Sequence, residues 1–165
     1  MEYVEVIVEH DLEGVTPEMI DWWWDNINEE RYSLWHPKDH KGFKWEVHPK
    51  EKGHVGAVHI AEEDIGEATV TLRIRWEDPK NVPIPVTMSH AVAASIIDEN
   101  GEPIAWLVHQ YEATPHGAKM LSTFKIPAML PEEFAKGLYK HCQEEMGNLP
   151  KFLPELYKKY GRRQD

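Results

Sequence analysis

A succession of strand-like segments followed by one long helical segment constrains the fold of this chain more than any other feature. Asp98 to Glu102 has the composition of a hairpin turn and joins two of the segments. A run of neighbouring strands closed by a helix is typical of α+β proteins with an antiparallel sheet. The segments that we expect to form strands are residues 43–47, 54–63, 68–76, 86–97, 103–114 and 118–126.

The region before these segments predicts one more strand and a first helix. Residues 3–9 alternate in polarity as a strand does, and Thr16-Pro17-Glu18 is a typical helix start. We expect an irregular stretch from Asn28 to about Phe43. The order of elements therefore predicts a sheet wrapped around a long C-terminal helix, with a cavity between them.

The last helix is predicted over residues 131–146. Pro131 suits the first helical position and two glutamates follow it, whereas Gly147 and Pro150 are expected to stop the helix. Positions 134, 138, 141 and 145 lie on one helical stripe, so His141 and Glu145 continue the apolar line of Phe134 and Leu138. A buried carboxylate needs a partner, and a divalent metal shared with the histidine is one arrangement that supplies it. The alternative is a solvated helix face that carries polar residues.

Composition and charge exclude several classes of protein. The 165 residues predict one domain, residues 1–165, and the net charge of -11 argues against a nucleic-acid surface. The paired basic residues, Lys158-Lys159 and Arg162-Arg163, lie at the tail. A single cysteine, Cys142, excludes an internal disulfide. The N-terminus has no visible signal peptide and no segment is apolar enough to span a membrane, so we expect a cytoplasmic protein.

Other candidate site residues lie in the middle of the chain. Residues 32–40, YSLWHPKDH, combine two histidines, an aspartate and two aromatic residues around Pro37. Either Glu62 or Glu63 should point inward from its strand. Alternation slightly favours Glu62, whose face carries the bulkier apolar residues, although a bulge would reverse this. The central strands carry two histidines, His90 and His109. His109 shares a strand face with Tyr111. Imidazole is a natural proton donor at neutral pH, so either histidine is a candidate.

Five motifs are distributed along the chain: VEHDLEGVTPEMIDWWWDN, RYSLWHPKDH, VGAVHIAEEDIG, VHQYEATPHGAKMLSTF and HCQEE. Together they resemble the diacetylphloroglucinol hydrolase family, which includes phloretin hydrolase. The similarity covers nearly the whole chain. We expect the chain to begin almost directly with the main domain, without the additional N-terminal region that larger relatives carry. The resemblance implies the helix-grip fold, which is birch-allergen-like and START-like. It also implies zinc-dependent hydrolysis of the carbon–carbon bond between a phenolic ring and an acyl group.

The resemblance also implies roles for particular residues. The metal ligands would be His40, His141, Glu145 and one of Glu62 or Glu63. Tyr32 would hold a phenolic hydroxyl, with Tyr111 as a second anchor. His90 or His109 would donate a proton to the leaving ring carbon, and Asp39 would orient a histidine.

Two functions from different classes therefore remain. The first is a zinc-dependent retro-Claisen hydrolase acting on a small phenolic or aromatic ketone, in which the metal would lower the pKa of water and polarise the acyl carbonyl. Two histidines with two carboxylates also suit other divalent ions, such as iron or manganese. The second is a non-catalytic helix-grip binder of an apolar small molecule. The sequence leaves the oligomeric state open, and a homodimer is compatible with it.

Overall fold

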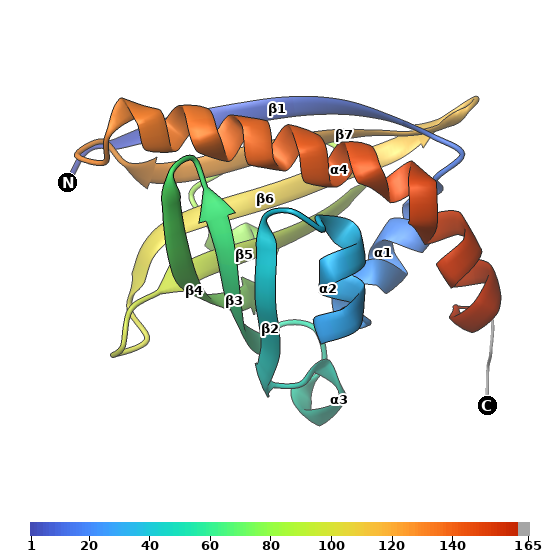
Figure 1. Cartoon of the computed structure of the whole chain (residues 1–165), viewed down its shortest axis with the longest axis horizontal. Coiled ribbons are helices and arrows are strands. Elements are labelled where there is room, and N and C mark those ends of the chain that lie inside the picture. The colour runs from blue at the N-terminus through green and yellow to red at the C-terminus, as the bar shows by residue number, and fades with distance from the viewer. Residues whose placement is uncertain (162–165) are drawn as a thin grey trace.

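The computed structural model describes residues 1–161, which form one antiparallel sheet and a long helix across it (Figure 1). Arg162 and Arg163 lie outside the described residues. The elements, in chain order, are β1 (Tyr3–Glu13), α1 (Pro17–Asp25), α2 (Glu29–Trp35), β2 (His40–Val47), α3 (Pro49–Lys52), β3 (Val58–Ile65), β4 (Ala68–Glu77), the 3-10 turn η1 (Pro79–Asn81), β5 (His90–Ile97), β6 (Pro103–Thr114), β7 (Gly117–Pro127) and α4 (Glu132–Tyr160).

The strands of the described chain are hydrogen-bonded in the order β1-β7-β6-β5-β4-β3-β2, and every neighbouring pair is antiparallel. The sheet curves around α4, while α1 and α2 lie beside the C-terminal half of that helix (Figure 1). Alternate residues of β1, such as Val6, Val8 and Leu12, are buried toward the helix. The predicted α+β helix-grip fold is confirmed.

The first helix begins as the sequence indicates, but the second was not predicted. Thr16 caps α1, since its side chain accepts a hydrogen bond from the backbone N–H of Met19 at 3.2 Å. The stretch after Asn28, expected to be irregular, contains α2. The sequence signal for the start of α2 is an N-terminal cap. The Asn28 side chain accepts a hydrogen bond from the Arg31 backbone N–H at 2.8 Å, and two glutamates occupy the first turn.

The predicted C-terminal end of the last helix is wrong. The helix does not stop at Gly147 but continues to Tyr160 through two internal prolines, Pro150 and Pro154. Leu149 and Leu153 are fully buried and extend the same apolar stripe, so their packing outweighs the backbone hydrogen bonds that proline removes. Figure 1 shows the axis of α4 bending in this C-terminal part. No helix within residues 1–161 has the length and apolar character that crossing a bilayer requires.

A close backbone contact fixes α4 against the turn between β3 and β4. Gly66 occupies that turn with a φ of +64°, a conformation that favours glycine. A Cβ atom at Gly137 would lie only 2.5 Å from the Gly66 nitrogen, so only glycine allows this approach. The contact lies three residues from Glu63 on one side and four residues from His141 on the other. It therefore sets the distance between β3 and α4, two of the elements that carry the candidate site.

Candidate metal centre and cavity

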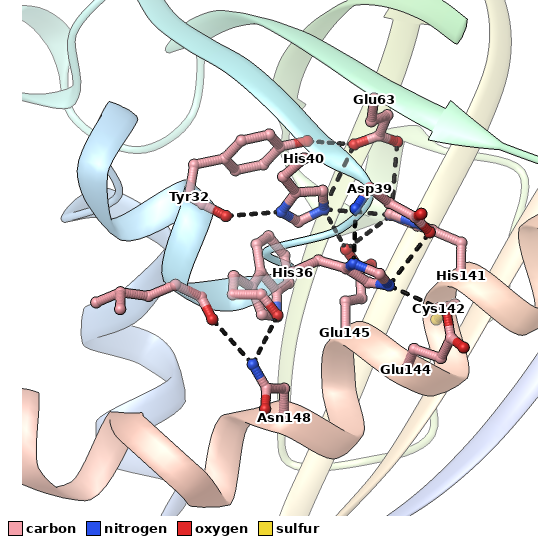
Figure 2. A network of polar contacts seen from close by, with 12 residues as sticks. Tyr32, His36, Asp39, His40, Glu63, His141, Cys142, Glu144, Glu145 and Asn148 are labelled. Atoms are coloured by element: carbon pink, nitrogen blue, oxygen red, sulfur yellow. Dashed lines mark hydrogen bonds and ion pairs between the residues drawn. The ribbon is translucent and has the colours of Figure 1, made fainter.

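Four ionisable side chains from three elements converge beneath the sheet (Figure 2). All four are buried, each with less than a tenth of its surface exposed. They lie far apart in sequence: β2 supplies one histidine, β3 one glutamate and α4 a histidine and a glutamate. The residues are His40, Glu63, His141 and Glu145. The prediction that His141 and Glu145 lie on the buried face of the last helix is confirmed.

The inward glutamate of β3 is Glu63, so the preference for Glu62 is corrected. Glu62 is exposed and pairs with Thr71 on the outer face, where Ile60 also lies opposite Arg73. The pairing of β3 with β4 is regular, and the inner face is that of Ala61. Side-chain bulk was a poor guide, because the inner face includes Ala61, which is small and fully buried, whereas the bulkier Ile60 lies on the outer face.

A bulge in β2 turns His40 toward the same interior. His40 pairs with Glu63 and Gly42 pairs with Glu62, so β2 contains one extra residue at this point. The shift allows His40 and Phe43 both to face inward, although strict alternation would place them on opposite faces. The bulge thus brings an imidazole from an edge strand into contact with α4.

The hydrogen bonds of the two imidazoles fix which nitrogen of each faces the cluster. His40 donates from Nδ1 to the backbone carbonyl of Tyr32 at 2.8 Å, and His141 donates from Nδ1 to Asp39 Oδ2 at 3.0 Å. Each Nε2 therefore carries its lone pair inward when the ring is neutral. These two Nε2 atoms face one another at 3.3 Å, and Glu145 Oε2 lies 3.0 and 3.1 Å from them. An arrangement of facing acceptors requires a cation between them, either a proton or a metal ion.

The spacing of the donor atoms fits a divalent metal. Ligand atoms 2.0–2.2 Å from a zinc ion lie roughly 3.3–3.6 Å apart at the corners of a tetrahedron. The distances from the two Nε2 atoms to Glu145 are slightly shorter than this, and those to Glu63 are 3.6 and 3.8 Å. Two imidazoles and two carboxylates at these distances match the donor set of a zinc, iron or manganese site.

The ionised side chains of the cluster stabilise one another's charges against the effect of burial. Burial alone would lower the pKa of His141, but the charge of Glu145, together with Glu63 and Asp39, raises it to about 10. Burial would conversely raise the pKa of Glu145, and the two histidines hold it well below its usual range. In the absence of a metal the pair is therefore an imidazolium and a carboxylate, and binding a metal would displace the proton of His141.

A second layer of contacts, only partly indicated by the sequence, holds the ligands in place (Figure 2). His36 accepts from the Asp39 backbone N–H at 2.9 Å and donates from Nε2 to Glu144 Oε1 at 3.0 Å. Asn148 donates to the carbonyl oxygens of Leu34 and Trp35, which fastens the end of α2 to α4. Asp39 has the position predicted for it, beside a histidine of the cluster. Glu144 and Asn148 carried no signal, because only the packing of α4 on α2 gives them partners.

Tyr32 lies at the edge of the cluster. Its hydroxyl donates to Glu63 Oε2, and its ring stacks on His40 with centroids 3.7 Å apart. Burial, followed by the charge of Glu63, raises the pKa of Tyr32 well above its usual value. The phenol is therefore neutral, and its oxygen retains lone pairs that can accept from a ligand.

Three residues of the cluster, Glu63, His141 and Glu145, form part of the wall of a cavity of about 220 Å³. Most of the wall is aliphatic or aromatic, and the polar groups converge at one side, as is common in small-molecule sites. His109 lies in this wall and stacks on Trp24 with centroids 5.2 Å apart. Its Nδ1 lies 2.7 Å from Ser122 Oγ, which leaves Nε2 for the cavity, and burial lowers its pKa to about 4.

The structure does not bring His90 or Tyr111 to the wall of this cavity. Both bind Asp21 of α1: His90 Nδ1 lies 2.9 Å from Oδ2, and the Tyr111 hydroxyl donates to Oδ1 at 2.5 Å. Tyr111 also accepts from Trp24 Nε1 at 3.2 Å. Strand alternation correctly placed Tyr111 and His109 on one face, but the groups that α1 adds cover Tyr111.

Comparison with known sequences identifies relatives. The sequence model of the family described as DAPG hydrolase PhiG domain matches residues 3–130. This range includes Tyr32, His40 and Glu63 but ends before α4. The chain is 24% identical over 190 residues to 2,4-diacetylphloroglucinol hydrolase of Pseudomonas protegens, covering 90% of this chain and 62% of that protein. It is 26% identical over 176 residues to phloretin hydrolase of Eubacterium ramulus, covering 88% and 64%. The chain thus spans less than two-thirds of the length of these relatives.

Comparison with solved structures supports the fold alone. The structure of Ara h 8.0201 matches with a TM-score of 0.64 at 13% identity, over 93% of this chain and 99% of that one. Ginseng major latex-like protein 151 from Panax ginseng matches with a TM-score of 0.60 at 9% identity, over 90% and 96%. The similarity extends over nearly the whole chain, so the arrangement of sheet and helix is shared throughout.

Proposed function

Because the chain belongs to the DAPG hydrolase PhiG domain family, we propose that it is a metal-dependent hydrolase of the bond between a phenolic ring and an acyl group. The names of its relatives support acylphloroglucinol- or phloretin-like substrates. In this reaction water adds its hydroxyl to the acyl carbon, the carbon–carbon bond breaks, and the ring carbon gains a proton. The products are a free phenol and a carboxylic acid.

The observation that carries the proposal is the pair of imidazole Nε2 atoms that face each other beside two buried carboxylates, in a cluster of which three residues line the cavity. His40, Glu63, His141 and Glu145 would hold the metal, and zinc is our first choice for the ion. When bound, such an ion supplies Lewis-acid polarisation of a carbonyl and lowers the pKa of water.

The other cavity residues support the handling of a phenolic ring and a proton. The Tyr32 oxygen, which donates its own proton to Glu63, would accept a hydrogen bond from a phenolic hydroxyl of the substrate. His109 would deliver a proton from Nε2 to the ring carbon and be resupplied at Nδ1 through Ser122. Its lowered pKa suits this relay, since a neutral imidazole can give a proton at one nitrogen while taking one at the other.

The test combines metal analysis with an activity assay. We expect purified protein to contain close to one divalent ion per chain and to release free acid from an acylphloroglucinol or a dihydrochalcone. Removal of the metal with a chelator should abolish this release, and zinc should restore it. Glu145→Gln should greatly reduce both metal content and turnover, whereas Glu133→Gln, an exposed change on the same helix, should alter neither. Full activity of the Glu145→Gln variant would remove Glu145 from the metal site.

The second candidate, a non-catalytic binder of an apolar small molecule, is favoured by the mainly apolar wall of the cavity. In that case the histidines and glutamates would satisfy one another as buried ion pairs. A metal-free protein whose His141→Ala variant keeps its stability and ligand affinity would support this function and contradict the hydrolase.

A further inference from the structure

Six aromatic side chains that line the cavity contact one another in a closed series, which we call the aromatic collar. Neighbouring ring centroids in this series are separated by 4.8 to 6.1 Å, with the shortest distance between Phe43 and His59. Every member lines the cavity, and Tyr32 joins the collar to the polar cluster through Glu63. In order along the series, the members are Tyr32, Phe43, His59, Trp76, Trp24 and Trp35.

His59 is an ionisable member of the collar to which the proposed mechanism gives no role. It is 5% exposed and stacks on Phe43, and its Nδ1 has no hydrogen-bond partner among the residues that the structure describes. Burial lowers its pKa to about 3, so the ring is neutral at pH 7 and carries one proton. Because Nδ1 is enclosed without an acceptor, the proton is better placed on Nε2, where a ligand oxygen can accept it.

The collar and the rest of the cavity differ in chemistry. On β4, Trp76 belongs to the collar while Leu72, four residues away and so roughly 13 Å along the strand, lines the opposite part. This other part is mainly aliphatic, although Phe124 and Phe134 also line the cavity outside the collar, and it includes Ile104 and Leu130, which are exposed to solvent. Its wall includes Ile65, Leu72, Ile96, Leu107, Ile126 and Leu138.

From this division we propose how the substrate lies in the cavity. This proposal rests on the proposed function. The aromatic collar binds the phenolic ring, His59 donates a hydrogen bond to a ring oxygen, and the aliphatic part accepts the acyl chain. The scissile bond then lies where the two parts meet, beside Tyr32 and the four-residue cluster. A wall of aromatic rings favours a flat aromatic group, and a buried neutral donor favours a hydroxylated one. His59 is thus assigned as a specificity-determining residue for a hydroxylated ring, and the aliphatic part permits acyl chains longer than acetyl.

The experiment measures equilibrium binding of two probes that the enzyme cannot cleave, using the metal-loaded protein. Phloroglucinol represents the ring and 2-octanone the acyl chain, and calorimetry gives the Kd of each. We expect His59→Phe to weaken the binding of phloroglucinol about tenfold, as the loss of one hydrogen bond would. The Kd of 2-octanone should not change. Ala105→Leu should weaken the binding of 2-octanone and leave the Kd of phloroglucinol unchanged, because Ala105 lines the aliphatic part beside its strand partner Ile96.

Further variants and outcomes make the assignment falsifiable. His59→Gln keeps an N–H donor and should retain most of the affinity for phloroglucinol even if His59→Phe proves unstable. Equal weakening of both probes by His59→Phe and His59→Gln, or an unchanged Kd for phloroglucinol in both, would overturn the assignment. So would the absence of phloroglucinol binding to the unmodified protein. Because neither probe is hydrolysed, a failure of the enzymatic proposal would show only in the turnover assay and would not alter this binding pattern.

Discussion

Replacement of Gly137 by alanine tests whether the contact of α4 with the β3–β4 turn holds the metal centre together. The added Cβ would lie 2.5 Å from the Gly66 nitrogen, 2.6 Å from its Cα and 3.3 Å from the Ile65 carbonyl carbon. Ordinary contacts begin at 3.4 Å, so the helix would have to retreat by roughly 0.9 Å. The obstacles are backbone atoms, which cannot rotate away as the end of a side chain can.

This displacement of α4 in the Gly137→Ala variant has two consequences, one for stability and one for metal binding. Overpacking of this kind costs about 1–3 kcal/mol of unfolding free energy. The helix also carries His141, whose Nε2 lies 3.8 Å from Glu63 Oε1, at the long end of the donor spacings. Ligands of a metal site must be held within about 0.5 Å of their positions, so a displacement of this size should weaken metal binding as well.

The matched control is Gly147→Ala on the same helix. A Cβ at Gly147 meets nothing within 4 Å, so this change should stabilise the protein by about 0.5–1 kcal/mol through helix propensity. Denaturant unfolding and a competition assay for zinc affinity, applied to both variants, give the comparison. If Gly137→Ala were as stable as Gly147→Ala and bound zinc as tightly as the unmodified protein, the contact would not position the site.

Two further predictions concern the charges around the cluster. Asp39→Asn should weaken zinc binding about 10- to 100-fold, because a neutral amide replaces the charged acceptor of the His141 Nδ1 proton. The same change at Asp64, outside the cluster, should leave zinc affinity unchanged. Unchanged zinc affinity in the Asp39 variant would contradict the role of this hydrogen bond. Above about pH 7.5 an unfolded histidine is mostly neutral, while His141 of the metal-free folded chain, with its raised pKa, keeps a proton. The unfolding free energy of the metal-free protein should therefore fall by about 1.4 kcal/mol per pH unit between pH 7.5 and 8.5, and not in the zinc-loaded protein, as denaturant titrations can measure. A metal-free protein that is equally stable across this range would contradict the charged state assigned to His141.

Local patterns predicted the elements whose signals are local. Alternation located the strands, the residues around Thr16 located the first helix, and the turn at Asp98 to Glu102 joins β5 to β6 as expected. The end of α4 could not be predicted in this way, because Gly147 and Pro150 are unfavourable for a helix and only the burial of Leu149 overcomes them. Local residues set the helix propensity of this segment, but whether the helix continues depends on its packing against residues far away in the chain.

The residues of the candidate site likewise fall into two groups, those with a local sequence signal and those whose position depends on tertiary packing. The stripe of α4 indicated His141 and Glu145 without any tertiary information, whereas the choice of Glu63 over Glu62 depends on how closely α4 and the aromatic side chains approach the inner face of β3. His40 points inward only because of a bulge in β2, which strict alternation cannot anticipate. Each of these departures from local preference brings a donor atom to the same point. Facing imidazole lone pairs and buried carboxylates would destabilise a protein that had nothing to place between them, and this cost is physically reasonable only if a cation offsets it.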